Sequence, residues 1–300
     1  MTIIGSVTRT AVGNIASPQQ GNANAGAFTA RSGAINLGFF SSVGDAKQAV
    51  NGRIGGPLRW SREDMRGGIE HYVARDIPLD PLEMLGDNLL IWSEVDSNAR
   101  VINGTTMKVD LIGDQSGNGY VFEQNEPELQ GTLVTNAVNS YSALELSQPD
   151  AHRMAVTLRL SPPFSIIVVG NYLGTGGAVS NLLLSDGASP WRVGVNAVGQ
   201  WEYDNGGRTT ISAGRADATP AMLTVRQDTT WGELRVNRVS VGTNDLTPSD
   251  ATQISLGRAT PDLSAGPWGG RFAALLCLDT TTISLVENAE RYTRKRFGTP

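Results

Sequence analysis

The residues whose types and spacing could support catalysis stand at WEYDNGG, residues 201–207. Side chains alternate along a strand, so Glu202 and Asp204 share one face, where two carboxylates can serve as nucleophile and general acid–base in glycoside hydrolysis. Gly206 and Gly207 follow at once. Two carboxylates before a Gly-Gly turn also describe a solvated strand edge, and we predict that edge rather than a catalytic pair.

The sequence lacks the other common constellations of catalytic residues. Its only histidines, His71 and His152, lie in different regions, and it has no Gly-x-Ser-x-Gly elbow, phosphate-binding loop or dinucleotide-binding glycine motif. The single cysteine, Cys277, belongs to the apolar run FAALLCL and is predicted to be buried. A zinc site would require more histidine or cysteine than the chain contains. We therefore predict no catalytic residues and no enzymatic activity.

Calcium is the one cofactor for which the sequence supplies ligand types. DQSGNG at 114–119 and YDNGG at 203–207 carry Asp and Asn oxygens of the kind that calcium prefers. The same residues occur in ordinary turns that contain Asn, Asp and Gly, and neither segment has the spacing of an EF-hand loop. We predict structural turns and no bound cofactor, with calcium as the alternative.

Aromatic residues in the same region indicate a sugar-binding surface. Trp201 and Tyr203 share a strand face beside Asn205. Sugar rings stack on aromatic faces while polar side chains bond the hydroxyl groups, so these three residues are the predicted glycan or partner contacts. Trp231, in DTTWGE, is predicted to lie at a hairpin tip, where an exposed tryptophan would mark an interface. The alternative is that Trp201 belongs to the core together with Trp191.

Composition and charge restrict the partners. The 300 residues carry a formal net charge of −5, and the charged residues, 18% of the chain, are mixed without a basic stripe. Because phosphate contacts dominate nucleic-acid affinity, we predict no nucleic-acid partner. The longest apolar run is far short of the ~20 residues that span a bilayer, and no secretory signal is visible at the start. We predict a soluble protein made in a cytosol, without membrane insertion.

Short segments typical of strands dominate from residue 88 onward. They are separated by Gly, Asn, Asp or Pro turns, the spacing of a sandwich or barrel. The segment 164–173 has an apolar run and is predicted to lie in the middle of a sheet, whereas 191–197 and 232–242 alternate and should each have one solvated face. The predicted strands span 88–92, 121–124, 142–147, 154–160, 164–173, 180–186, 191–197, 200–205, 221–228, 232–242, 251–259 and 271–279.

The last predicted element is an amphipathic helix over 285–297. Ser284 and Glu287 have the spacing of a capping box, and Gly298 follows as the helix end. Four basic residues fill the last turns, where cations complement the helix dipole. We therefore predict a structural role for this basic cluster rather than a phosphate site.

The first 87 residues differ in composition from the rest. Residues 1–56 are small and polar and offer little to bury, so they are predicted to form an extended arm or, alternatively, a disordered tail. Phe28, Phe39 and Phe40 favour an arm that orders against neighbouring subunits. Residues 57–87 are predicted to form a helical connector. Its two helices are predicted over 61–74 and 80–86.

Six motifs follow one another along residues 88–300 in the order and spacing of a known group of proteins. With them the region resembles the concanavalin A-like lectin/glucanase superfamily, in the laminin-G-like jelly-roll form common in bacteriophage virion proteins. The motifs are NLLIWSEVDS (88–97), IGDQSGNGYVF (112–122), PPFSIIVVGNYLG (162–174), MLTVRQDTTWGELRVNRVSVG (222–242), ISLGRA (254–259) and GGRFAALLCLDTTTISLVENAERYTRKRFG (269–298).

The resemblance implies a mainly β fold, an antiparallel jelly-roll sandwich over 88–300 closed by a C-terminal helix. The arm and the helical connector would precede it. Glucanases of this superfamily carry a third carboxylate after the pair, and here Gly206 and Gly207 occupy its place. In the bend of the long hairpin motif, Asn237-Arg238 replaces the Asn-Gly of the family.

The resemblance and the missing catalytic groups together predict a structural protein of a bacteriophage virion. It would be a head-decoration, collar or tail component, made in the host cytoplasm and located in the virion. Its arm would dock on other virion proteins and on copies of the chain, as a homo-oligomer, and its jelly roll would face outward and contact host-surface glycan. The alternative is a free carbohydrate-binding or glycan-hydrolysing protein.

Overall fold

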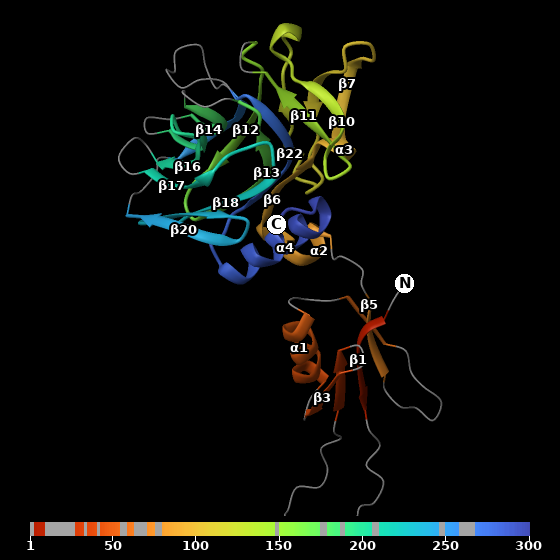
Figure 1. The fold of residues 1–300 in the computed structure, drawn as a ribbon. Coiled ribbons are helices and arrows are strands. Elements are labelled where there is room, and N and C mark those ends of the chain that lie inside the picture. The colour runs from red at the N-terminus through yellow and green to blue at the C-terminus, as the bar shows by residue number, and fades with distance from the viewer. Residues whose placement is uncertain are drawn as a thin grey trace, which may run out of the picture. The chain divides into compact units, whose positions relative to one another are not determined.

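The chain, described here by a computed structural model, divides into two compact units, Met1–Asp80 and Pro81–Pro300. The division falls inside the connector that was predicted over 57–87. Figure 1 shows the helices and strands of each unit. The structure describes residues 3–9, 28–32, 35–40, 43–54, 59–62, 71–75 and 80–300, apart from 148–149, 175–178, 187–189, 206–209, 246–249 and 258–267.

The described residues of the N-terminal unit form a five-stranded antiparallel sheet with one helix. The strand order is β3-β2-β1-β5-β4, and α1 packs against β1, β2 and β3. Val7 of the central strand and Ala46 and Val50 of α1 are fully buried, so helix and sheet share a small core. The elements are β1 Ile3–Arg9, β2 Phe28–Ser32, β3 Ile35–Phe40, α1 Val43–Ile54, β4 Arg59–Arg62 and β5 His71–Arg75.

The helix expected over 61–74 is wrong at both of its ends. Arg59–Arg62 and His71–Arg75 are strands that pair with each other in antiparallel register, and residues 63–70 between them lie outside the described residues. The apolar positions that suggested a helical face include Tyr72 and Val73, which are adjacent and belong to opposite faces of β5.

The three phenylalanines of the predicted arm lie on paired strands. Phe28 of β2 is the register partner of Phe40 in β3, and Thr29 is the partner of Phe39. These backbone positions therefore belong to the sheet of the N-terminal unit. Their role in assembly stays a prediction.

The C-terminal unit is an antiparallel β-sandwich, which confirms the predicted mainly β, jelly-roll-like fold. Its described residues form 17 strands in one hydrogen-bonded set. The strands β20, β19, β18, β13 and β22 pair in this order, and β22 continues to β6 and β11. A second series runs β17, β16, β15, β14, β21 and β12. The main core lies between these two layers.

Most strand predictions from residue 88 onward agree with the observed elements within a few residues. The strands are β6 Leu89–Glu94, β7 Ala99–Asn103, β8 Lys108–Ile112, β9 Phe122–Glu123, β10 Thr132–Val138, β11 Tyr141–Leu146, β12 Arg153–Leu160, β13 Phe164–Tyr172, β14 Ser180–Ser185, β15 Trp191–Val195, β16 Gln200–Asn205, β17 Thr210–Arg215, β18 Ala221–Gln227, β19 Gly232–Val236, β20 Val239–Asn244, β21 Ala251–Gly257 and β22 Gly270–Leu278. The helices are α2 Pro81–Leu85, α3 Val95–Asn98 and α4 Ile283–Phe297, with 3₁₀ turns η1 Gly86–Asn88 and η2 Pro127–Leu129.

The position of β13 between two apolar clusters explains why its sequence is almost continuously apolar. Ile166 and Val168 face the main core, while Ile167 faces a second cluster that contains Val286 and Ala289 of α4. Because helices cover one face of the layer and the other sandwich sheet covers the opposite face, all residues of β13 are buried. The predicted central position of 164–173 is confirmed, as is the burial of Cys277 in the neighbouring strand β22.

The segment 232–242 is a hairpin, and the polar residues of its first strand are not solvated as expected. Its two strands turn at Asn237 and Arg238, with φ of 50° and 72°, the left-handed conformation of a tight hairpin turn. Glu233 and Arg235 of β19 are 6% and 9% exposed. Helix α4 packs against this end of the layer, and the alternating pattern alone could not reveal that cover.

Helix α4 begins and ends differently from the capping pattern in its sequence. Its N-cap is Thr282, without a side-chain capping bond, so Ser284 lies inside the first turn and the predicted capping box with Glu287 is wrong. Its end agrees with the prediction: Gly298 takes a left-handed conformation at φ 61°, and its N–H bonds the Arg294 carbonyl.

Two buried carboxylates hold α4 on the sheet, and the first is Glu94 of β6. Glu94 is 1% exposed. Its Oε1 accepts hydrogen bonds from Trp92 Nε1 at 3.0 Å and from the Tyr292 hydroxyl at 2.6 Å. Its Oε2 accepts from Arg296 Nε and Nη2 at 3.3 and 3.2 Å. The sheet thus supplies the anion, and the helix supplies the cation and a hydroxyl donor.

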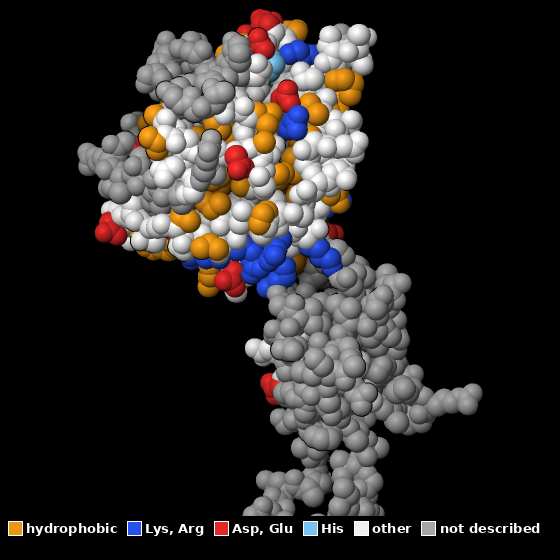
Figure 2. All heavy atoms as spheres, viewed as in Figure 1, with side chains coloured by type: hydrophobic (Ala, Val, Ile, Leu, Met, Phe, Trp, Pro, Cys, Tyr) orange, Lys and Arg blue, Asp and Glu red, His pale blue; other side chains and the backbone are white. Residues whose placement is uncertain are grey.

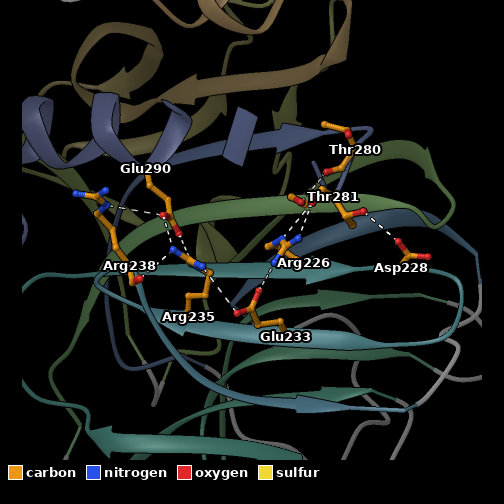
Figure 3. Close-up of polar contacts among 9 residues, drawn as sticks. Arg226, Asp228, Glu233, Arg235, Arg238, Thr280, Thr281 and Glu290 are labelled. Atoms are coloured by element: carbon orange, nitrogen blue, oxygen red, sulfur yellow. Dashed lines mark hydrogen bonds and ion pairs between the residues drawn. The ribbon is translucent and has the colours of Figure 1, made fainter. Parts of the chain in front are cut away.

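The second carboxylate, Glu290, is on the helix and points to the sheet (Figure 3). It is fully buried and accepts from Arg235 Nε at 2.9 Å and Nη2 at 3.2 Å. Arg235 Nη1 also lies 3.8 Å from Glu233, which bonds Arg226 Nη1 at 2.5 Å. Arg226 in turn donates to the Thr281 carbonyl just before α4. The two ion pairs therefore cross the helix–sheet boundary in opposite directions.

Replacing Glu290 with Gln should lower the free energy of unfolding of the sandwich by about 3 kcal/mol, because it leaves the Arg235 charge buried without its partner. The matched control is Glu287→Gln on a more exposed part of the same helix, which should change it by less than about 0.5 kcal/mol. Urea unfolding followed by tryptophan fluorescence measures both. Equal midpoints for the two variants would show that the buried pair does not hold the helix.

Candidate functional site

The two carboxylates that could have been catalytic share a single arginine. In the register of β15 and β16, Arg192 lies opposite Asp204, and Gly194 lies opposite Glu202. Arg192 Nε bonds Asp204 Oδ2 at 2.9 Å, and its Nη2 contacts Glu202 Oε1. Burial raises the pKa of the Glu202 carboxyl, and the Arg192 charge opposes that rise. Both carboxylates are thus ion-paired to one cation.

This geometry corrects the prediction of a solvated strand edge. Glu202 and Asp204 do share one face, as alternation required, but their side chains are only 7% and 14% exposed. An arginine bonded to a carboxylate lowers its basicity and its freedom to attack a substrate. The arrangement is suited to holding β15 against β16.

The predicted sugar platform lies on the opposite, inward face of β16. Trp201 is 3% exposed and stacks on Trp268, with ring centroids 5.9 Å apart and planes at 27°. Tyr203 is fully buried, and its hydroxyl bonds Gln227 Oε1. Both rings belong to the main core, so neither can present a face to a sugar, and the alternative of core residues holds. Asn205 ends strand β16.

Trp231 lies in the β18–β19 connection, as predicted, but is half-buried there. The Arg226 guanidinium stands over its ring, 5.0 Å from the centroid. A cation over one face of the indole occupies the surface on which a sugar would stack. The expected exposed tip is therefore a packed corner of the sandwich.

The candidate calcium turn at 114–119 is held by internal hydrogen bonds. Asp114 Oδ1 accepts from the Trp92 N–H at 2.9 Å and from the Ser116 N–H at 2.8 Å, and Oδ2 accepts from the Ser116 hydroxyl at 2.6 Å. These bonds use the carboxylate oxygens that a cation would need. Within the described ranges, no cluster of three or more His, Cys, Asp or Glu side chains could hold a metal ion.

His152 has the environment of a structural histidine. It is buried, and its Nδ1 lies 3.1 Å from the Ser147 N–H, which donates to it. Lys108 Nζ lies 3.1 Å from Nε2. Burial, followed by the Lys108 charge, lowers the pKa of His152, so the ring is neutral at pH 7. His71 lies in β5 of the other unit.

Basic side chains gather on the surface over α4 (Figure 2). We call the group of Arg238, Arg291, Arg294 and Lys295 the α4 basic surface; the first two are half-buried and the last two exposed. The sequence interpretation assigned the helix residues to the dipole and missed Arg238, which is distant along the chain. The available signal was its position in the hairpin bend, where the family has glycine.

Among the described residues, no helix is long and apolar enough to cross a bilayer.

Replacing Trp201 with Ala should destabilise the sandwich by about 3–5 kcal/mol, because it empties a large core site. Trp231→Ala, at the half-buried corner, should cost less than about 1.5 kcal/mol and serves as the control. Chemical denaturation of both variants, followed by circular dichroism, provides the comparison. A Trp201 variant as stable as wild type would return this ring to the surface.

Comparison with known proteins finds solved structures of similar fold but no matching protein family. No protein-family model and no curated protein sequence matches the chain. The sialidase of Trypanosoma rangeli, solved in complex with sialic acid, is similar with a TM-score of 0.50 at 10% identity, over 80% of this chain and 43% of the sialidase. The receptor-binding domain of botulinum neurotoxin type G is similar with a TM-score of 0.48 at 11% identity, over 71% of this chain and 54% of that domain.

The chain thus spans less than half of the sialidase and about half of the neurotoxin domain. At these identities the similarity concerns the fold alone. Together with the strand pairing and the closing helix, it agrees with the fold that the sequence motifs implied. The described residues of Pro81–Pro300 form a β-sandwich of the concanavalin A-like lectin/glucanase type.

Proposed function

We propose that the sandwich binds a glycan without cleaving it. The observation that carries this proposal is the state of the carboxylate pair, since Arg192 is bonded to both Glu202 and Asp204. A hydrolase of the retaining or inverting type needs one carboxyl group as acid and one as nucleophile or base. The fold supports the binding half of the proposal, because the similar sialidase was solved with sialic acid. Fold similarity alone does not determine function, so the proposal must be tested at the level of binding.

The setting we propose is a bacteriophage virion. The motifs at 88–300 resemble the jelly rolls of virion proteins, and the chain has a second compact unit, Met1–Asp80, of different construction. In this proposal the N-terminal unit docks on other virion proteins and on further copies of the chain. The sandwich then faces outward from a head-decoration, collar or tail position and contacts host-surface glycan. A free carbohydrate-binding protein remains the alternative.

The full chain should bind at least one member of a panel of neutral and acidic bacterial oligosaccharides, and should release no reducing sugar from any of them. Binding is expected because the chain has a lectin-type sandwich. Hydrolysis is not expected because Arg192 forms ion pairs with both Glu202 and Asp204. Isothermal titration measures binding, and a reducing-end assay measures hydrolysis. Hydrolysis that disappears in Glu202→Gln would make the protein a glycosidase, and a panel without any bound sugar would remove the glycan function.

Phage particles assembled with a tagged chain should contain it in a fixed copy number, because docking through the N-terminal unit is part of assembly. Quantitative mass spectrometry of gradient-purified particles measures the stoichiometry. A chain that begins at Pro81 should stay out of the particles, provided that its circular dichroism matches the folded sandwich. Normal incorporation of that folded fragment would contradict docking through residues 1–80, and absence of the full chain from particles would favour the free protein.

A further inference from the structure

Within the α4 basic surface, Arg238 makes only a distant ion pair with a carboxylate in the described part of the chain. Glu290 lies beneath it, but both of its oxygens accept hydrogen bonds from Arg235. Arg238 Nε is 3.9 Å from Glu290 Oε2, beyond hydrogen-bond distance, and this buried nitrogen has no hydrogen-bond partner among the described residues. Figure 3 shows the two arginines on either side of the same carboxylate. The Glu290 carboxylate therefore lies between two guanidinium groups, and it is hydrogen-bonded only to that of Arg235.

Arg291 adds a further positive charge beside Arg238. Burial and then the repulsion from Arg238 lower the pKa of Arg291, while Glu287 acts in the opposite sense. The side-chain hydrogen bond of Arg291 goes to a neutral group, Asn288 Oδ1, at 3.2 Å. Two guanidinium groups from different elements thus repel each other at the protein surface. An anion bound between them would relieve that repulsion.

The helix dipole accounts for only part of this surface. Arg294 and Lys295 stand in the last turn of α4, where cations stabilise the carbonyl end of a helix. Arg291 lies before that turn, and Arg238 belongs to the β19–β20 bend rather than to the helix. The dipole therefore does not account for the charge of Arg238, and the carboxylate of Glu290 lies 3.9 Å from its Nε.

We propose that the α4 basic surface binds the carboxylate groups of an acidic glycan. The proposal rests on the proposed glycan-binding function and names the chemical class of the sugar. Guanidinium groups form paired, charge-assisted hydrogen bonds with planar carboxylates, and the Arg238 side chain is 32% exposed. A nucleic acid fits less well, because the chain carries a net charge of −5 and polyphosphates need an extended basic track.

The experiment measures binding of the full chain to polygalacturonate, a carboxylated polysaccharide, with dextran as the neutral polysaccharide and duplex DNA as the polyphosphate. We expect binding to polygalacturonate that weakens with added salt, and none to dextran. The double variant Arg238→Gln/Arg291→Gln should bind at least about tenfold more weakly, because it removes two guanidinium groups that form charge-assisted hydrogen bonds. Arg294→Gln, at an exposed position where loss of folding is not expected, should weaken binding about threefold.

The matched control is Arg159→Gln, whose side chain is 81% exposed on β12 in the other layer. It should bind as the wild type does, and unfolding midpoints verify that all variants are folded. Unchanged affinity in both the double variant and Arg294→Gln would overturn the proposal, as would stronger binding to DNA with the same dependence on the arginines. Binding of neutral sugars from the panel without polygalacturonate would overturn it while the glycan-binding function stands. Failure of every carbohydrate would instead remove the function on which it rests.

Discussion

The reciprocal exchange of buried carboxylates between α4 and the sheet is the constraint on which much of the sandwich depends. The helix covers the outer face of the layer that contains β13, β18 and β22, and without it Ile167 and Met222 would face water. Apolar burial supplies the attraction, but it does not fix the helix in one position. Glu94 and Glu290 fix its position, because a shift of the helix would leave their buried charges without partners, which is costly.

The same constraint sets the electrostatics of the surface above it. Since Glu290 is hydrogen-bonded to Arg235 of the sheet, it cannot fully neutralise the arginines that lie farther out. The opposite layer behaves differently, because Arg192 there is matched by two carboxylates. The charges around Arg192 are thus paired within the fold, while the face that contains α4 leaves cationic groups at the surface, and a ligand-binding surface is more readily built on the second.

Much of the sandwich could be predicted from sequence, because most of its strands are short apolar segments between turn residues. The strands that escaped prediction, among them β7, β10 and β17, have at most two apolar residues in succession. The site was less accessible. Alternation placed Trp201 and Glu202 on opposite faces of one strand, but it could not say which face was the core. Nor could local sequence reveal that Arg192 bridges the carboxylates, or that Arg238 approaches Arg291 from a different element.

The pairing of β6 with β22 joins the first strand of the sandwich to its last. Leu89 and Leu278 are register partners although nearly the whole sandwich sequence lies between them. Such distant pairing is slow, because a long loop must close before its contacts form. During synthesis, β6 and β13 can pair with β22 only after that strand has left the ribosome. Strands that lack their final partners expose apolar surface, and exposed apolar surface promotes aggregation.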